Sequence, residues 1–193
     1  HISFLDASTV GDVDLGQLAS LGQLEAYPVT SPDQLDERLQ HASIAITNKV
    51  VIDAAALQNA PHLKLICIAA TGTNCVDLAA AKAAGITVCN VAGYSTASVT
   101  QHTLGLLINL ATGMNRYAGE LSQWAQSPIF TRLDYPMIDL AGKTLGIIGL
   151  GTIGKSVAKA AQGFGMNVVA LSRDGAEQGE IERLQHDAFF SKS

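Results

Sequence analysis

The pattern G-x-G-x-x-G, formed by Gly149, Gly151 and Gly154, is the feature that most restricts the fold of this chain. It stands between an apolar run and a helical pattern, and a second apolar run follows at 167–171. In such a strand–turn–helix unit the first glycine permits a tight turn and the second lets the backbone approach a pyrophosphate. The third lets the helix pack closely on the sheet. Unpaired N–H groups at the helix start, together with the positive end of the helix dipole, favour a phosphate anion.

The motif therefore predicts dinucleotide binding. Because the chain holds 18 glycines, the spacing alone could arise by chance, and the flanking strand and helix give it weight. The alternative is a glycine-rich structural turn in an ordinary α/β domain. The residues of this turn expected to contact the cofactor are Gly149, Gly151, Thr152, Ile153 and Gly154.

The composition favours a globular protein with a large apolar interior. Of 193 residues, 48% are hydrophobic and 15% are charged, which suits buried parallel strands covered by helices. A net charge of −5 argues against a nucleic-acid partner, because such binding needs a basic face. No apolar run is long enough to span a membrane, so no membrane partner is expected. The cysteines lack a C-x-x-C pair and no signal peptide is visible, which favours a reduced, cytoplasmic location.

Short apolar runs alternate with helical patterns along the chain, which predicts an α/β fold made of βαβ units with parallel sheets. Strands are expected at 2–6, 24–27, 43–47, 65–69, 87–89, 144–148 and 168–171. Shorter helices are expected at 31–40, 53–59, 78–84, 155–161 and 181–190.

A single long helix is expected from 95 to 123, where apolar residues recur at a spacing of three or four. Gly105 and Gly113 lie within it and are unfavourable in a helix, which indicates close packing at both positions. The helix begins the second of two α/β domains, which are expected at 1–95 and 96–193.

Two segments resemble a known family. They are LAGKTLGIIGLGTIG at 140–154 and GYSTASVTQHT at 93–103. Both are similar to the D-isomer-specific 2-hydroxyacid dehydrogenases, and the second indicates the branch of glycerate dehydrogenases and hydroxypyruvate reductases. The resemblance implies a flavodoxin-like substrate domain at 1–95 and the first part of a Rossmann dinucleotide-binding domain at 96–193. It also implies a homodimer formed through the long helix.

The resemblance further implies that a loop of the first domain holds the substrate carboxylate on backbone N–H groups, at Thr71 and Gly72 in this chain. A glycine-containing turn after a strand can direct successive amides at an anion. The alternative is an ordinary strand-to-helix loop capped by Asn74 or Asp77. The Arg, acidic residue and His that perform the family's chemistry match no residue here. No catalytic residue and no metal site are therefore assigned, and the chain alone is expected to be inactive.

The end of the strand at 168–171 bears on the choice of cofactor. In family members that prefer NAD, an acidic residue at this point accepts hydrogen bonds from the adenosine ribose. This chain has Ser172 followed by Arg173. A carboxylate would repel a 2′-phosphate, whereas a hydroxyl and a guanidinium can bind one. The sequence therefore favours NADP over NAD, unless a bulge in the chain returns Asp174 to the ribose.

The leading hypothesis is an oxidoreductase that transfers a hydride between NAD(P)H and a small anionic 2-oxo or D-2-hydroxy acid. Hydroxypyruvate, glyoxylate and D-glycerate are the favoured substrates. An alternative is a dinucleotide-sensing interaction protein of the corepressor type on the same fold, which would carry a peptide-docking groove on the first domain. A third hypothesis is that this polypeptide is a catalytically inactive fragment.

Overall fold

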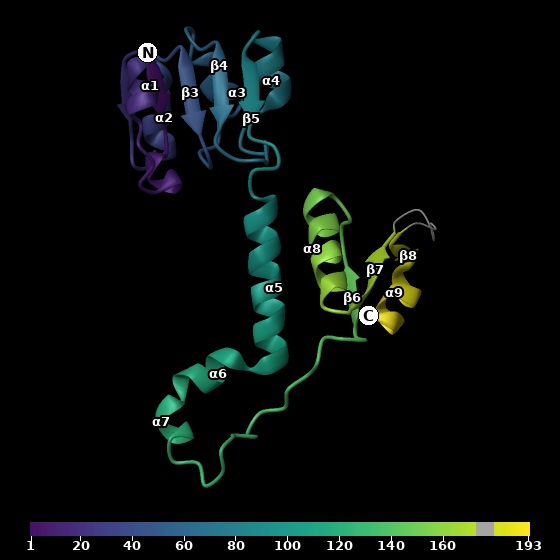
Figure 1. Ribbon diagram of the computed structural model, residues 1–193. Helices are drawn as coiled ribbons and strands as arrows, with labels where there is room; N and C mark the ends of the chain where they lie inside the picture. The colour runs from purple at the N-terminus through teal and green to yellow at the C-terminus, as the bar shows by residue number, and fades with distance from the viewer. Residues whose placement is uncertain (173–179) are drawn as a thin grey trace. The chain divides into compact units, whose positions relative to one another are not determined.

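The computed structural model describes residues 1–172 and 180–193 (Figure 1). The chain forms two compact units, His1–Tyr94 and Ser95–Ser193. Each unit combines a parallel sheet with helices, so the predicted α/β class is confirmed.

The first unit is built on a five-stranded parallel sheet in the order β2-β1-β3-β4-β5. This is the flavodoxin-like order implied by the resemblance. The strands are β1 (Ile2–Phe4), β2 (Leu24–Ala26), β3 (Ile44–Thr47), β4 (Leu65–Ile68) and β5 (Thr87–Asn90). Each one lies at a predicted apolar run.

Helices cover both faces of this sheet. They are η1 (Ala7–Val10), α1 (Gly16–Ser20), η2 (Pro32–Gln34), α2 (Leu35–Leu39), α3 (Ala54–Gln58) and α4 (Leu78–Ala83). On one face, α2, α3 and α4 enclose a core that includes the fully buried Leu39 and Ile66. On the other face, η1 and α1 pack near Phe4 and Ile46. The sequence pattern did not predict η1 or α1.

Aspartates start two of these helices. Asp53 accepts the N–H of Ala56 at 2.9 Å and so caps α3, and Asp77 accepts the N–H of Ala80 at 2.9 Å and caps α4. Such a cap satisfies a backbone donor that has no partner within the helix. Beyond α4, Gly85 has φ of 71°, a left-handed conformation that turns the chain toward β5.

Asp6 joins the carboxyl ends of β1 and β3. Asp6 is only 3% exposed. Its carboxylate accepts hydrogen bonds from the backbone N–H groups of Asn48 at 2.9 Å, Lys49 at 2.6 Å and Val50 at 3.3 Å. The strand order reverses between β1 and β3, and α/β sheets often bind ligands at such a point. Here the Asp6 carboxylate and the backbone that it binds occupy that position.

We expect Asp6→Ala to lower the free energy of unfolding by about 3 kcal/mol, because three backbone N–H groups lose a buried, charged acceptor. Urea denaturation followed by circular dichroism measures the change. The exposed Asp12 supplies the control, and Asp12→Ala should change stability by no more than about 0.5 kcal/mol. Equal unfolding midpoints for the two variants would show that the hydrogen bonds of Asp6 do not stabilise the fold.

The second unit contains a three-stranded parallel sheet in the order β6 (Thr144–Ile147), β7 (Asn167–Leu171) and β8 (Glu182–Leu184). Helix α8 (Thr152–Gly163) joins β6 to β7, and α9 (His186–Lys192) follows β8. Helix α5 (Thr96–Thr112) also belongs to this unit, because Leu104 and Leu107 pack on the cluster that includes Val157 and Ala161 of α8. None of the helices in the described residues is long and apolar enough to cross a membrane.

The prediction of one helix from 95 to 123 is wrong. Helix α5 ends at Thr112, and the chain continues as α6 (Met114–Gly119) and α7 (Leu121–Trp124). Gly113 has φ of 64°, and its N–H donates to the carbonyl of Asn109 at 2.8 Å. Gly113 therefore ends the helix. At Gly105 a Cβ would meet nothing within 4 Å, so the close packing expected there is not found among the described residues.

The helix predicted at 181–190 is wrong as well. Its first part is the strand β8, whose Leu184 pairs with Leu171 of β7, and only α9 is helical. Gln185 separates the two with an extended backbone. The buried Phe189 of α9 packs on the sheet so closely that a Cβ added to Gly146 would lie 2.7 Å from its ring.

Candidate dinucleotide-binding site

The turn between β6 and α8 brings the three motif glycines into one short loop. Gly149 has φ of 96°, a left-handed conformation that favours glycine, and it redirects the chain after β6. A Cβ added to Gly154 would lie 2.2 Å from the carbonyl oxygen of Gly149, so the helix meets the loop at a distance that only glycine permits. A Cβ added to Gly151 would meet nothing within 4 Å. The open side of Gly151 thus leaves room for a pyrophosphate beside the backbone.

The start of α8 offers hydrogen-bond donors to this space. Gly151 is the N-cap, and no side chain caps the helix. The N–H of Lys155 bonds back to the carbonyl of Gly151 at 2.9 Å, whereas the N–H groups of Thr152 and Ile153 precede the first intrahelical bond. Thr152 and Ile153 are exposed, and the 12 residues of α8 align a dipole that favours an anion at this end. The loop therefore fits the phosphates of a dinucleotide.

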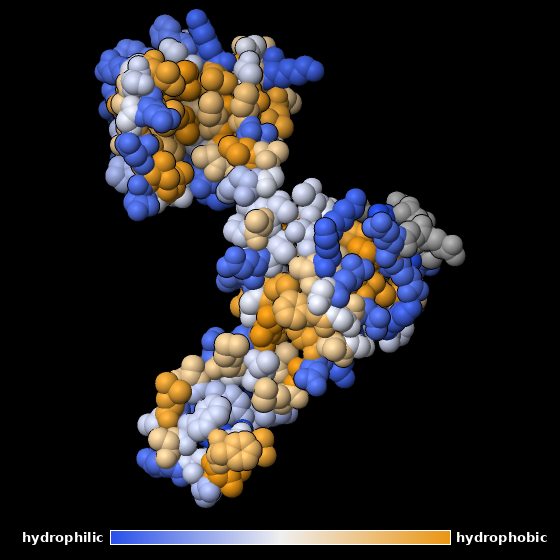
Figure 2. Space-filling view, viewed as in Figure 1, coloured by the Kyte–Doolittle hydropathy of each residue, from blue (hydrophilic) through white to orange (hydrophobic). Residues whose placement is uncertain are grey.

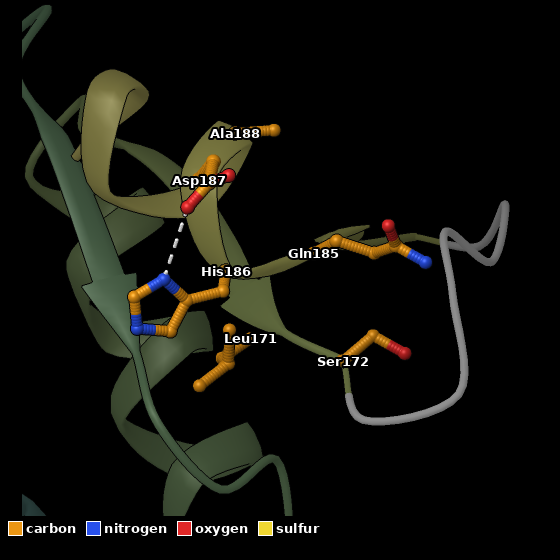
Figure 3. Close-up of a pocket in the computed structure, with 6 residues that line it drawn as sticks. All are labelled: Leu171, Ser172, Gln185, His186, Asp187 and Ala188. Carbon is orange, nitrogen blue, oxygen red and sulfur yellow. Dashed lines mark hydrogen bonds and ion pairs between the residues drawn. The ribbon is translucent and has the colours of Figure 1, made fainter.

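A pocket of about 580 Å³ opens beside the carboxyl end of β7 (Figure 3). Its lining residues are Leu171, Ser172, Gln185, His186, Asp187 and Ala188. The N–H of Ser172 donates to the carbonyl of Leu184 at 2.9 Å, which fixes the backbone at the pocket. His186 Nδ1 lies 3.2 Å from Asp187 Oδ1 on the exposed rim. Because β6 and β7 are parallel neighbours, this pocket and the glycine turn lie at the same edge of the sheet.

In the first unit, the loop after β4 contains Thr71 and Gly72, both exposed. The hydroxyl of Thr71 donates to the carbonyl of Val91 at 2.9 Å, and the side-chain amide of Asn90 donates to the carbonyl of Thr71 at 2.7 Å. These bonds tie the loop to the end of β5. Asp77 caps α4, as the alternative interpretation of the loop predicts. This cap does not involve residues 71–72, which are exposed.

Comparison with known proteins decides the family. Residues 4–189 match the model of the catalytic domain of the D-isomer specific 2-hydroxyacid dehydrogenases. The chain belongs to this family. It is 44% identical over 192 residues to the glycerate dehydrogenase of Methylorubrum extorquens, covering 96% of this chain and 61% of that protein. It is 37% identical over 165 residues to the hydroxypyruvate reductase of Blautia hydrogenotrophica, covering 83% of this chain and 51% of that protein. The resemblance read from the sequence is thus confirmed.

Solved structures share the fold of this 2-hydroxyacid dehydrogenase chain. An acyclic imino acid reductase in complex with NADPH and D-Arg superimposes with a TM-score of 0.82 at 23% identity, covering all of this chain and 62% of that one. The D-lactate dehydrogenase from Aquifex aeolicus, complexed with NAD and lactic acid, gives a TM-score of 0.80 at 23% identity and covers 58% of that chain. The chain therefore spans about three fifths of the length of these proteins.

Some of the candidate site of this 2-hydroxyacid dehydrogenase chain was not foreseen from the sequence. Gln185, His186 and Asp187 line the pocket, yet the predicted helix at 181–190 gave them no role. The sequence carries one signal that a helix begins here, because Asp187 is an acidic residue of the kind favoured in a first helical turn. Arg173, predicted to lie beside Ser172 at the cofactor, is outside the described residues. In residues 1–172 and 180–193, no group of three His, Cys, Asp or Glu side chains is arranged to hold a metal ion.

Proposed function

We propose that the protein containing this chain reduces a small 2-oxo acid with a nicotinamide dinucleotide. The observation that carries the proposal is the glycine turn at 149–154, which opens toward solvent at Gly151 in a chain of the 2-hydroxyacid dehydrogenase family. The names of its relatives, glycerate dehydrogenase, hydroxypyruvate reductase and glyoxylate reductase, support D-glycerate, hydroxypyruvate and glyoxylate as substrates.

In this proposal residues 1–95 form the substrate domain and residues 96–193 belong to the dinucleotide-binding domain. The N–H groups at Gly151, Thr152 and Ile153 bind the pyrophosphate, while those of Thr71 and Gly72 bind the substrate carboxylate. The dinucleotide, when bound, supplies the hydride. The 193 residues contain no match to the family's Arg, acidic residue and His. We therefore expect the isolated chain to bind the cofactor without turning over substrate.

We further propose that the cofactor is NADP rather than NAD. Ser172 directly follows β7 at the pocket wall and carries no charge, so it does not repel a 2′-phosphate. Arg173 follows it in the sequence and would add a charge-assisted hydrogen bond to that phosphate.

The free thiols of Cys67, Cys75 and Cys89 support a cytoplasmic location, where such cofactors and reduced cysteines coexist.

The variant Ser172→Asp is expected to shift preference toward NADH. The new carboxylate repels the 2′-phosphate and can accept hydrogen bonds from a free ribose. Loss of a charge-assisted contact corresponds to roughly a tenfold to hundredfold fall in kcat/KM with NADPH. Steady-state kinetics of the full-length protein with both cofactors measures this. Ser172→Asn, which is close in size but uncharged, is the control. A parallel loss with NADPH and NADH would remove the reason for assigning NADP.

We also propose a homodimer formed through α5 and the segment that follows it. Phe130 is 97% exposed and Leu110 is 80% exposed, and Figure 2 shows apolar surface over this segment. Side-chain contacts link the parts of this segment, because Arg132 bridges Glu120 at 2.9 Å and the Tyr117 ring packs at a tilt against Trp124 and edge-on against Tyr135. A surface that exposes several large apolar side chains together is typical of an interface. At Gly105 a partner helix can approach the backbone of α5.

Multi-angle light scattering of the full-length protein tests the dimer. The wild type should have the mass of two chains at micromolar concentration, and Phe130→Asp should shift the mass toward one chain. Val13→Asp, at an exposed apolar position of the first unit, should leave the mass unchanged. A monomeric wild type at these concentrations would end the proposal.

A further inference from the structure

Cys67 and Cys89 are register partners on neighbouring strands. Strands β4 and β5 run parallel, and the register of their pairing places Cys67 opposite Cys89. Ile66 and Ile68 flank Cys67 on β4, and Val88 precedes Cys89 on β5. These three neighbours pack with the core beneath α3 and α4. Since successive strand residues point to opposite faces, both cysteines lie on the other face of the sheet. The two thiols therefore share a face and are one strand spacing apart.

The two thiols differ in exposure. Cys89 is exposed and Cys67 is partly buried beside the cluster on that face. Burial raises the pKa of the Cys67 thiol, and the nearby Cys89 raises it further by a smaller amount. Cys89 is thus the sulfur that a dissolved oxidant reaches, and Cys67 is the adjacent thiol that can trap an oxidised Cys89. Cys75 is buried at another place in the unit and serves as an internal reference.

The spacing of the strands suits a disulfide that reduces readily. Neighbouring strands lie roughly 4.8 Å apart, within the range of about 4.4–6.8 Å between the Cα atoms of a disulfide. The Cβ atoms of a disulfide lie about 3.8 Å apart, so the two strands must approach slightly to form one. The approach of the strands strains the disulfide. A strained disulfide is reduced more readily, as is typical of redox-sensing disulfides in the cytosol.

We propose that Cys67 and Cys89 form a reversible disulfide when the protein meets a hydroperoxide. The Cys89 thiolate attacks the O–O bond of hydrogen peroxide, forms an S–O bond and, after proton uptake, releases one water. The Cys67 sulfur then attacks the Cys89 sulfur, the S–S bond forms, the S–O bond breaks and a second water leaves with the thiol proton. The two thiols lose two electrons, and the peroxide gains them. A small thiol such as glutathione reverses the reaction by thiol–disulfide exchange.

The bridge lies next to the loop that carries Thr71 and Gly72. Val91 donates its N–H to the carbonyl of Ala70 at 3.0 Å and accepts the Thr71 hydroxyl, so the end of β5 holds that loop. A disulfide would draw β4 and β5 together at Cys89, two residues before Val91. The loop that Val91 holds would then shift. Resting on the proposed function, this shift raises the KM for the 2-oxo acid by about tenfold if one amide–carboxylate hydrogen bond is lost. The KM for NADPH stays unchanged, because that cofactor is assigned to the second unit.

Peptide mapping of the full-length protein tests the disulfide without any need for activity. The protein is treated with hydrogen peroxide, its remaining thiols are alkylated, and tryptic peptides are weighed before and after reduction. Cys67 and Cys75 share the tryptic peptide 65–82, so a Cys75→Ala background makes the assignment unique. We expect peptides 65–82 and 83–116 to be joined after oxidation and separated by glutathione.

Cys89→Ser is the matched variant, and it should give no joined peptide and retain its KM after peroxide. Alkylation of both thiols in peroxide-treated Cys75→Ala protein would overturn the disulfide, and joined peptides with an unchanged KM would overturn its coupling to the loop. A disulfide that forms in a protein without 2-oxo acid reductase activity would refute the proposed function and leave the modification site standing.

Discussion

Gly154→Ala should destabilise the second unit by about 3 kcal/mol or more. The added Cβ would lie 2.2 Å from the carbonyl oxygen of Gly149 and 3.2 Å from its carbonyl carbon, both backbone atoms. Overpacking against movable side chains costs about 1–3 kcal/mol, and a backbone neighbour can yield less than a side chain. We expect the melting temperature, followed by circular dichroism, to fall by roughly 10 °C or more.

Gly163, in the last turn of the same helix, provides the control. A Cβ there would meet nothing within 4 Å, and alanine is a better helix former than glycine. Gly163→Ala should therefore raise stability by up to about 1 kcal/mol. If Gly154→Ala melts with the wild type, the helix does not pack against the glycine turn in the way described.

Gly151→Asp should preserve the fold and strongly weaken cofactor binding. The backbone at Gly151 has φ of −81° and ψ of −162°, an extended conformation open to any residue, and the space around a new Cβ is empty. Aspartate is a preferred N-cap, so α8 should not lose stability. The carboxylate would enter the space assigned to the pyrophosphate, where it repels the phosphates. We expect the affinity for NADPH to fall at least about a hundredfold, as measured by isothermal titration calorimetry.

Gly151→Ser separates charge from bulk in this experiment. Serine also caps a helix well but carries no charge, so it should bind NADPH more tightly than Gly151→Asp and less tightly than the wild type. Equal affinity and equal stability of the wild type and both variants would place the pyrophosphate elsewhere.

The elements that depend on local pattern could be predicted from the sequence. Strands β1 to β7 follow from short apolar runs, and the position of the turn after β6 follows from the glycine spacing. The break at Gly113 was missed because the apolar spacing continues through Met114 and Tyr117 on its far side, while a positive φ leaves no trace in that periodicity. The conformation of Gly113 alone separates α5 from α6.

The pocket beside Ser172 depends on tertiary pairing and so could not be predicted in the same way. Strand β8 has three residues, too few for alternation to distinguish it from a helix, and its pairing with β7 determines it. The placement of Gln185 and His186 at the pocket follows from that pairing. In the first unit, the bonds that tie Thr71 to Asn90 and Val91 likewise join residues far apart in the sequence.

We propose that this chain holds the dinucleotide with which the whole protein reduces a 2-oxo acid. The most direct test of this proposal follows the absorbance of NADPH in the presence of the purified full-length protein and hydroxypyruvate or glyoxylate. We predict that NADPH is oxidised only when the 2-oxo acid is present, and that the isolated 193-residue chain oxidises none. A folded full-length protein that leaves both NADPH and NADH unoxidised with both acids would contradict the claim.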